Sequence, residues 1–434
     1  MIKQKTILII GGGSAGIFAA LTAKTEKNDV IIIEKNKALG QKLAITGSGR
    51  CNVTNLDSKE DFFDNINTNA KFFYSAFSNF SNYDMIAYLE KIGVGVKCEG
   101  NKAYPANESA QKLVNSFIRQ LENKGVKIHT GEELIDLEIS DEDGKKMVSS
   151  LKTTNGKYEY KNDFDYVIIA TGGLSYTINK TFKLLKQKNI KITKMYPSLT
   201  GIDTVEDYSE LQGLSIQNVT VSADVGDKKI YAQTSDMLFT KNGISGPCVM
   251  KLTGKISGFQ DINDMKIDNC FPYKTDKKLA EKQKYITYKS KPIFIKLDFL
   301  PNISSQQLEN LLFNNQKQLL KTKLSQYLPH RLCKFLLEKY DKTDVNNLKK
   351  EQKLKILQEI KEHRLQVKNY GNISSATVTK GGIDILQISP KTMNFKGIDN
   401  LYFAGECLDI DAQSGGYNLQ IAFSTGYTAG LNFR

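Results

Sequence analysis

The chain has 434 residues, of which 40% are hydrophobic and 25% are charged, as is ordinary for a globular protein. That length allows one large core or about two or three domains. No apolar run approaches the roughly 20 residues that span a bilayer, so we expect no membrane span and a cytoplasmic location by default. The formal net charge is +13, which can mark a nucleic-acid partner. Because the lysines are dispersed and asparagine is abundant, we attribute the charge to compositional bias and do not expect nucleic acid as a partner.

The cysteines and histidines are too scattered to form a redox or metal motif. The chain contains six cysteines and three histidines, with no Cys-x-x-Cys pair and no zinc-like spacing. We therefore expect neither a redox dithiol nor a bound metal. Isolated cysteines of this kind are usually small core residues.

The N-terminal segment 6–16 reads TILIIGGGSAG. Its apolar run suits a strand that is buried on both faces, and the glycine spacing that follows is that of a dinucleotide-binding turn. The helix after such a turn directs its N-terminal amides at a phosphate. A second apolar strand ends in an acid about 20 residues further on, where a carboxylate accepts hydrogen bonds from ribose hydroxyls. The predicted site comprises Gly11, Gly13, Ser14, Ala15, Gly16, Glu34 and Lys35. The alternative is a glycine-rich turn in a doubly wound fold that binds no nucleotide.

The C-terminal segment 401–430 reads LYFAGECLDIDAQSGGYNLQIAFSTGYTAG. A chain that begins and ends on a nucleotide site must fold back to close one domain, which is typical of enzymes that bury FAD. An acid at the strand end is positioned to hold a ribityl hydroxyl. The amides that open the following helix would stabilise negative charge on a reduced flavin. The residues concerned are Gly405, Glu406, Gly416, Tyr417, Asn418 and Leu419, and the alternative for the glycine pair is a plain helix start.

Two further loops are expected to approach the cofactor. The first, GQKLAITGSGRCNVTN at 40–55, has basic side chains that can neutralise phosphate and an asparagine that can bond the flavin edge, although it also fits a capped loop with a surface arginine. The second follows the apolar strand 167–169, where small residues permit a close crossing, and its alternative is a simple strand-end turn. In FAD folds the segment around residue 134 often meets the adenine through backbone groups. These loops contribute Gln41, Lys42, Thr46, Gly49, Arg50, Cys51, Asn52, Leu134, Ala170, Thr171 and Gly172.

The pattern of elements changes along the chain. Apolar residues at helical spacing predict a helix over 110–123, and short alternating runs around 217–223 predict antiparallel strands. We therefore predict an α/β FAD-binding Rossmann-like domain of the glutathione-reductase type, formed by 1–192 and 368–434. A β-rich domain spans 193–303, with strands returning near 364–380, and a helical insertion spans 304–363. The polar stretch 258–291 is interpreted as a solvated hairpin, with a partner contact as the alternative.

These motifs resemble a bacterial FAD-dependent family that includes aminoacetone oxidase and the flavin reductase of bile-acid dehydroxylation. The resemblance is carried by GGGSAG, GQKLAITGSGRCNVTN, ATGGLSY, LFTKNGISGP, VTKGGI and the C-terminal segment from SPKTMNF onwards. It implies an FAD domain built from both chain ends, with a β-rich domain and a helical insertion between them. The chain departs from the family at 177–188, which reads TINKTFKLLKQK and has no glycine, so a role for that loop near the cofactor is in doubt.

The function indicated is that of an FAD-dependent oxidoreductase moving a hydride between a small organic substrate and the flavin. With one dinucleotide fingerprint, NAD(P)H would dock transiently as electron donor, and we favour an NAD(P)H-linked reductase. The alternatives are an oxygen-using oxidase of an aminoketone-like substrate and, from another class, a flavin-bearing RNA-binding or RNA-modifying protein. No side chain is assigned as catalytic.

The loop 238–247 is the best-matched stretch outside the FAD domain. We expect it to line the substrate pocket together with the start of the C-terminal helix, so the candidate residues are Thr240, Asn242 and Tyr417. The alternative is a loop that only buttresses a domain junction. Cys51 is expected to have a packing or modulatory role.

Overall fold

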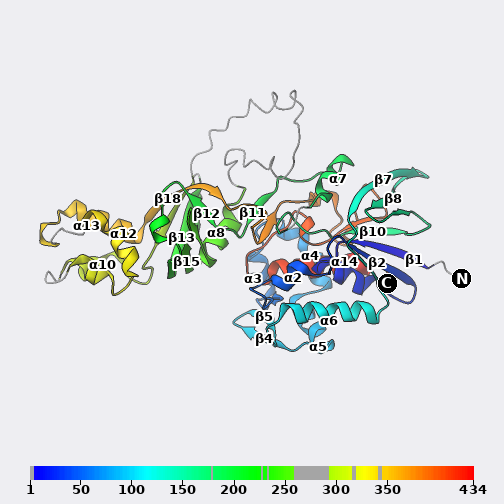
Figure 1. The fold of residues 1–434 in the computed structure, drawn as a ribbon, viewed down its shortest axis with the longest axis horizontal. Helices are drawn as coiled ribbons and strands as arrows, with labels where there is room; N and C mark the ends of the chain where they lie inside the picture. Colours follow the sequence, from blue (N-terminus) through cyan, green and yellow to red (C-terminus); the bar gives the residue numbers. More distant parts are fainter. Residues whose placement is uncertain are drawn as a thin grey trace, which may run out of the picture. The chain divides into compact units, whose positions relative to one another are not determined.

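The computed structural model describes residues 4–176, 179–225, 228–231, 234–258, 293–314, 319–340 and 345–434. It divides the chain into two compact units (Figure 1). Unit 1 comprises Met1–Tyr196 and Val378–Arg434, and unit 2 comprises Pro197–Thr377. Both chain ends therefore belong to unit 1. The segments predicted from the sequence as a β-rich part and a helical part fall together in unit 2, apart from the first few residues of the β-rich part.

Unit 1 is built on a parallel sheet with strand order β20-β10-β1-β2-β6. The apolar residues Ile7–Ile10 are buried, as expected for a strand that is covered on both faces. Strand β20 comes from the C-terminal segment and pairs with β10, so this segment completes the sheet. The parallel sheet predicted from the N-terminal and C-terminal motifs is confirmed. Its strands are β1 (Lys5–Ile10), β2 (Asn28–Glu34), β6 (Lys127–Thr130), β10 (Tyr166–Ile169) and β20 (Leu401–Phe403).

The helices α1 (Ser14–Ala23) and α14 (Tyr417–Leu431) bring the two ends of the chain into direct contact. A Cβ added at Gly426 would lie 2.2 Å from the carbonyl oxygen of Ala15, and one at Gly430 would lie 2.6 Å from that of Ala19. Only glycine permits this approach. The packing of the two helices therefore fixes the C-terminal segment beside the dinucleotide fingerprint.

Smaller elements complete unit 1. The helix predicted over 110–123 is confirmed as α6 (Ala110–Asn123), and the Ser109 hydroxyl caps it by accepting from the amide of Lys112 at 3.3 Å. Two antiparallel sheets are present, one of β3 (Thr54–Asn55), β5 (Lys102–Pro105) and β4 (Val96–Glu99), the other of β7 (Leu134–Glu142), β8 (Lys145–Thr153) and β9 (Lys157–Glu159). The remaining elements are α2 (Gln41–Ile45), α3 (Lys59–Asp64), α4 (Ala70–Asn79), α5 (Asn82–Lys91), α7 (Thr181–Gln187) and β19 (Val378–Lys380), and β11 (Tyr196–Ser198) contains the division between the units.

Unit 2 contains an antiparallel sheet with order β14-β13-β15-β16-β12-β18-β17, and a further pairing joins β13 to β17. This pairing joins the last strand of the order back to β13, so β13, β15, β16, β12, β18 and β17 form a ring and β14 lies outside it. The strands predicted around 217–223 are confirmed as β13 (Ser215–Val225). The others are β12 (Ile202–Thr204), β14 (Lys228–Tyr231), β15 (Ser235–Phe239), β16 (Gly243–Ser245), β17 (Phe294–Asp298) and β18 (His363–Tyr370), with helix α8 (Pro247–Ile256) following β16.

The helical segment of unit 2 joins the core of the sheet. Leu308, Leu332 and Ile356 belong to the same buried cluster as Val219 and Leu297. Figure 1 shows α10, α12 and α13 gathered beyond the strands. The helices are α10 (Ser305–Phe313), α11 (Leu320–Leu324), α12 (His330–Leu336) and α13 (Lys350–Lys361). The stretch 258–291 that the sequence singled out lies outside the described residues, apart from its first residue.

Candidate functional site

The glycine turn after β1 is shaped by close contacts on one side and open space on the other. Gly11 has φ +107°, and its added Cβ would lie 2.5 Å from the carbonyl oxygen of Ala170. An added Cβ at Gly16 would lie 1.9 Å from the carbonyl oxygen of Gly11, whereas one at Gly13 would meet no atom within 4 Å. Gly13 is the N-cap of α1 and no side chain caps this helix. The first-turn amides, including those of Ser14 and Ala15, are therefore available to an anion.

Glu34 ends β2 as a buried carboxylate held by the backbone. Its Oε2 accepts from the amide of Gly12 at 2.7 Å, and its Oε1 accepts from the amide of Asn36 at 2.8 Å. The Asn36 side-chain amide also donates to Oε1, at 2.6 Å. These bonds fix the carboxylate beside the glycine turn and leave an acceptor position on Oε2 for a ribose hydroxyl. Burial lowers the pKa of the neighbouring Lys35, while the nearby carboxylates of Glu133 and Glu34 act in the opposite direction.

Lys42 and Glu406 form an ion pair between the two ends of the chain. The Lys42 ammonium lies 2.8 Å from Oε2 and 3.0 Å from Oε1 of Glu406, and it also donates to Ser175 Oγ at 2.7 Å. The amide of Thr379 donates to Glu406 Oε1 at 3.0 Å. The sequence pointed to Lys42 as a phosphate ligand and to Glu406 as a ribityl ligand. The structure brings these two residues together and adds Ser175 and Thr379, which sequence reasoning missed.

Arg50 lies in a separate cluster of charged residues. Its Nη2 is 2.5 Å from Glu99 Oε1 and 2.9 Å from Glu108 Oε1, and its guanidinium lies 4.5 Å from the centre of the Tyr104 ring. Lys97 lies 2.8 Å from the same Glu108 oxygen. Two carboxylates thus accept from one guanidinium nitrogen of Arg50, the side chain that was predicted to neutralise phosphate. The expected phosphate contact of Arg50 remains a prediction.

The start of α14 is positioned by its own side chains. Gly416 is the N-cap with φ +97°, and its added Cβ would lie 2.5 Å from the carbonyl carbon of Thr54. Asn418 accepts from the amide of Ala412 at 2.9 Å and donates to its carbonyl oxygen at 2.8 Å. No side chain caps α14, so the amides of Tyr417, Asn418 and Leu419 are free to face an electron-rich group.

The Tyr417 side chain is committed to the protein interior. Its hydroxyl donates to Asp57 Oδ2, and its ring packs edge-on against Phe62 at 4.9 Å. Burial, together with the Asp57 carboxylate, raises the pKa of Tyr417. Because the Tyr417 phenol is buried and donates to a carboxylate, it anchors the start of α14. It is therefore not a freely exposed acid. Sequence reasoning had no signal for Asp57.

The other predicted residues lie around these groups. Cys51 is fully buried with φ +59°, and burial raises the pKa of its thiol to about 12, which marks an unreactive cysteine. Thr46 Oγ1 donates to the carbonyl oxygen of Lys42 at 2.9 Å, and the carbonyl oxygen of Gly49 accepts from the amide of Ala110 at 2.7 Å. Gln41 is the first residue of α2, and Leu134 is the buried first residue of β7. Gly405 packs against Ala15: a Cβ added at Gly405 would lie 2.6 Å from the Cβ of Ala15.

The loop after β10 is held by Asn179, which sequence reasoning also missed. The amide of Ala170 donates to the carbonyl oxygen of Ile10 at 2.8 Å. The Asn179 side-chain amide donates to the carbonyl oxygens of Thr171 at 3.2 Å and of Gly172 at 2.9 Å. Because this asparagine stands in the stretch 177–188 that departs from the family pattern, that stretch still supports the loop that crosses the sheet edge.

Buried polar atoms that lack a hydrogen-bond partner indicate where a nucleotide cofactor could bind. Within the described part of the chain they include Asn52 Oδ1, Thr68 Oγ1 and Gln413 Oε1. Gln413 precedes α14 by a few residues and Asn52 belongs to the loop predicted to meet the flavin. A buried polar atom is costly unless something pairs with it. Together with two uncapped helix starts and a ribose-type carboxylate, these atoms fit FAD bound across the carboxyl edge of the sheet.

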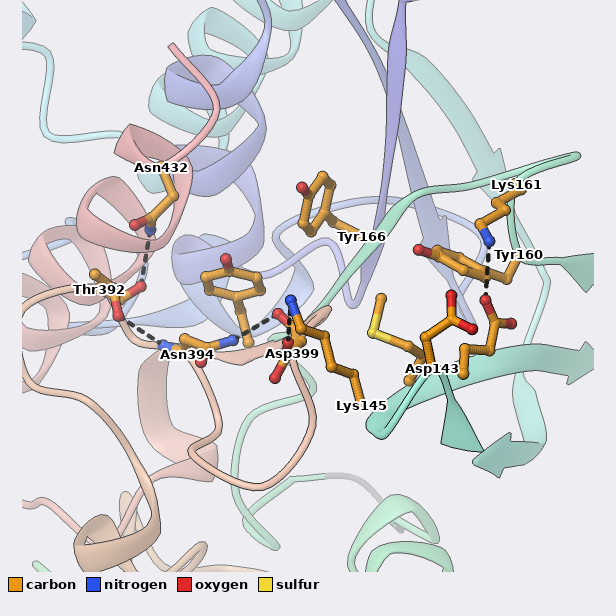
Figure 2. Close-up of a pocket in the computed structure, with 12 residues that line it drawn as sticks. Asp143, Lys145, Tyr160, Lys161, Tyr166, Thr392, Asn394, Asp399 and Asn432 are labelled. Atoms are coloured by element: carbon orange, nitrogen blue, oxygen red, sulfur yellow. Dashed lines mark hydrogen bonds and ion pairs between the residues drawn. The ribbon is translucent and has the colours of Figure 1, made fainter. Parts of the chain in front are cut away.

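A cavity of about 640 Å³ lies elsewhere in unit 1 (Figure 2). Tyr166, the first residue of β10, lines it together with Lys145, Tyr160, Asp399 and Tyr402. It therefore lies at the amino end of that parallel strand, whereas ligands of doubly wound sheets bind at the carboxyl ends. We do not assign the cofactor to this cavity.

The remaining candidates, Thr240 and Asn242, lie between β15 and β16 in unit 2. The amide of Thr240 donates to the carbonyl oxygen of Gly243, and the carbonyl oxygen of Asn242 accepts from the amide of Thr204, both at 2.9 Å. These bonds describe a fixed turn. Its predicted pairing with Tyr417 in a substrate pocket stays a prediction.

Two other kinds of site, a membrane span and a metal cluster, are absent from the described residues. No helix in that part of the chain is long and apolar enough to cross a membrane. The same residues contain no cluster of three or more histidine, cysteine or carboxylate side chains suited to a metal.

The fold and the site define a flavin-dependent oxidoreductase with a Rossmann-type FAD domain. A family model described as the HI0933-like protein Rossmann domain matches residues 5–432, and the chain belongs to this family. The family resemblance and the fold class inferred from the motifs are thereby confirmed. Family membership implies FAD as the cofactor, and it leaves the electron donor open.

Three curated proteins are similar to the chain over nearly its whole length. A ribosomal RNA dihydrouridine synthase of Haemophilus influenzae is 27% identical over 442 residues, which cover 100% of this chain and 99% of the relative. A protein of the same description from Escherichia coli is 26% identical and covers 97% of this chain and 96% of its own. A 3-dehydro-bile acid delta(4,6)-reductase of Clostridium scindens is 25% identical over 97% of each chain.

Proposed function

We propose that this chain is an FAD-dependent reductase that forms dihydrouridine in ribosomal RNA. The observation that carries the proposal is the full-length similarity to two proteins described as ribosomal RNA dihydrouridine synthases. The net charge of +13 agrees with a polyanionic substrate. This proposal replaces the sequence-based expectation of a small-molecule substrate without nucleic acid, and it corresponds to the RNA-modifying alternative.

The reactions named in the descriptions of these relatives have one chemical step in common. Dihydrouridine forms when the C5=C6 bond of uracil, which is conjugated to the C4 carbonyl, gains a hydride at C6 and a proton at C5. Reduction of a 3-keto bile acid with double bonds at positions 4 and 6 likewise adds hydrogen across a bond conjugated to a carbonyl. The two electrons would be supplied by bound, reduced FAD, for which we propose a reduced nicotinamide as donor, and the proton would come from a side chain or water. Reduction of such a conjugated bond is therefore the reaction type that we assign.

The residues of this chain serve to bind and orient the cofactor. Bound FAD, once reduced, supplies the hydride. We propose that the first turn of α1 holds the pyrophosphate, that Glu34 holds the adenosine ribose, and that the amides at the start of α14 stabilise negative charge at the flavin pyrimidine. The Lys42–Glu406 pair keeps the loops after β2 and β20 in register.

No thiol is assigned as proton donor. Cys51 and Cys407 lie within motifs predicted to meet the cofactor, and both are buried. Burial raises the pKa of each thiol to about 12. The Tyr417 hydroxyl already donates to Asp57. The donor of the proton to C5 is therefore left to solvent. Thr240 and Asn242 remain candidates for contacts that orient the substrate, since a hydroxyl and a carboxamide can hydrogen-bond to it.

A second candidate function is the reduction of a small conjugated ketone, which the bile-acid relative favours at 25% identity. The two candidates differ in substrate size and share the cofactor chemistry. The oxidase of an aminoketone-like substrate differs from both in passing electrons to oxygen.

The deciding experiment measures dihydrouridine in ribosomal RNA. Deletion of the gene in its source organism should remove this nucleoside from purified ribosomal RNA, and the wild-type gene should restore it. Purified holoenzyme with NADH or NADPH under nitrogen should form it in RNA from the deletion strain. Unchanged dihydrouridine after deletion, combined with rapid reduction of a steroid enone by the pure enzyme, would favour the small-molecule reductase. Oxygen uptake with an aminoketone would favour the oxidase.

A further inference from the structure

The helical segment of unit 2 carries a concentrated positive charge. Residues 304–361 contain twelve lysines and arginines against six acids, which is +6 of the +13 of the chain. The sequence as a whole suggested dispersed lysines, but this one segment holds a local excess. Its described residues alone include ten lysines and arginines and four acids, on α10 to α13 and the adjoining turns. Local excess charge of this kind attracts polyanions even when the total charge has a compositional origin.

Several of these cations have no partner within the described part of the chain. Lys334 on α12 and Lys350 and Lys355 on α13 are exposed, and none of them forms an ion pair with a described residue. Others are used internally. Lys361 lies 2.8 Å from Asp298 Oδ2, and Lys323 donates to the carbonyl oxygen of Leu312 at 2.8 Å. The exposed lysines are thus available as phosphate contacts.

Exposed apolar side chains lie on the same segment. Tyr327 is 41% exposed and Leu354, which lies between Lys350 and Lys355, is 54% exposed. An exposed tyrosine offers a face on which a nucleotide base can stack. Such a surface also raises the possibility of a membrane, but a membrane-bound helix needs a free apolar face. The apolar face of α13, formed by Ile356, Leu357 and Ile360, is buried in the protein.

We infer that helices α12 and α13 form a docking surface for the sugar-phosphate backbone of RNA. The inference rests on the proposed function and names the part of the chain that holds the RNA. Lys334, Lys350 and Lys355 contact phosphates, which positions the RNA without reading its sequence.

The test replaces these lysines by glutamine in the FAD-loaded, full-length protein. The triple variant Lys334→Gln/Lys350→Gln/Lys355→Gln is compared with a control triple variant, Lys71→Gln/Lys91→Gln/Lys112→Gln. The control lysines are also exposed on helices, and the described residues offer them no ion pair. Binding to ribosomal RNA from the deletion strain is measured by fluorescence anisotropy over a range of salt concentrations. Retained FAD and an unchanged circular dichroism spectrum show that both variants are folded.

We expect the α12–α13 variant to bind RNA about tenfold more weakly, and the slope of log K against log salt to become shallower by about 2. The control variant should bind as the wild type does. If the wild type forms dihydrouridine and the α12–α13 variant binds equally well, the docking surface is wrong while the proposed function stands. If the wild type neither binds RNA nor forms dihydrouridine, both fail. Loss of binding to phosphatidylserine vesicles with unchanged RNA binding would assign the surface to membranes.

Discussion

The Lys42 ammonium lies 2.8 Å from a carboxylate oxygen of Glu406, a residue 364 positions away in the chain. The segment after β2 is thereby tied to the segment between β20 and α14. Since both side chains are partly exposed, the pair is expected to act mainly by holding the two segments in register, and only weakly as a source of overall stability.

The Lys42–Glu406 pair is expected to couple cofactor binding to loop position. Lys42→Ala should weaken FAD binding about three- to tenfold and lower the free energy of unfolding by no more than about 1 kcal/mol. A double-mutant cycle with Glu406→Ala, measured by FAD titration of apoprotein, should show that the two effects are not additive. Lys97→Ala breaks an exposed contact with Glu108 and is the control. Strictly additive effects would show that the two residues act separately.

The glycine turn offers a matched pair of substitutions. Gly16→Ala places a Cβ 1.9 Å from a backbone oxygen and should lower the free energy of unfolding by about 1–3 kcal/mol. Gly13→Ala meets no protein atom within 4 Å, so stability should be unchanged. Its methyl group would instead face the bound pyrophosphate, and FAD affinity should fall about tenfold. Thermal unfolding of apoprotein and FAD titration separate the two effects, and a Gly13→Ala protein with normal FAD affinity would contradict the site.

Purified protein should be yellow and should release FAD, not FMN, on denaturation. Glu34→Ala should weaken FAD binding at least tenfold, since each charge-assisted hydrogen bond to ribose contributes about 1.5–3 kcal/mol. Glu34→Gln should have a smaller effect because it keeps an acceptor for the amide of Gly12. The fluorescence of released flavin measures both. Colourless protein that FAD cannot reconstitute would refute the cofactor assignment.

Cys51 should behave as a buried thiol. Burial raises its pKa to about 12, so a thiol reagent at pH 8 should label it only after unfolding. A raised pKa means that the native state resists ionisation. Its contribution to stability is therefore present below the unfolded pKa of about 8.5 and is lost as pH rises towards about 12. Cys51→Ser should leave flavin reduction by NAD(P)H largely intact, and loss of reduction with FAD still bound would show that the cysteine takes part in the chemistry.

The Tyr417 hydroxyl should be dispensable for cofactor binding but needed for the position of α14. Tyr417→Phe removes the donor to Asp57 and leaves an oxygen of this half-buried carboxylate without it, so stability should fall by about 1–3 kcal/mol. FAD should still bind because the amides of α14 come from the backbone. The double variant with Asp57→Asn should recover part of the loss. A Tyr417→Phe protein of normal stability that loses all turnover would instead identify the phenol as a catalytic acid.

Local sequence determined the parts of this protein that depend on neighbouring residues. The apolar run at 7–10, the glycine spacing at 11–16 and the acid at 34 specify a strand, a turn and a strand end, because each requirement is met within a few positions. The same holds for α6, whose periodicity and Ser109 cap lie within one short stretch. These patterns were sufficient to predict the Rossmann-like α/β domain, which is confirmed, and a dinucleotide site at the glycine turn, which stays a prediction.

Tertiary structure alone decided which charged and polar side chains pair. Arg50 is committed to Glu99 and Glu108, Lys42 to Glu406, and Tyr417 to Asp57, and these partners are brought together by strands and helices far apart in the sequence. Residue type and spacing state what a side chain can do, whereas only the packing of distant elements determines which atom it meets.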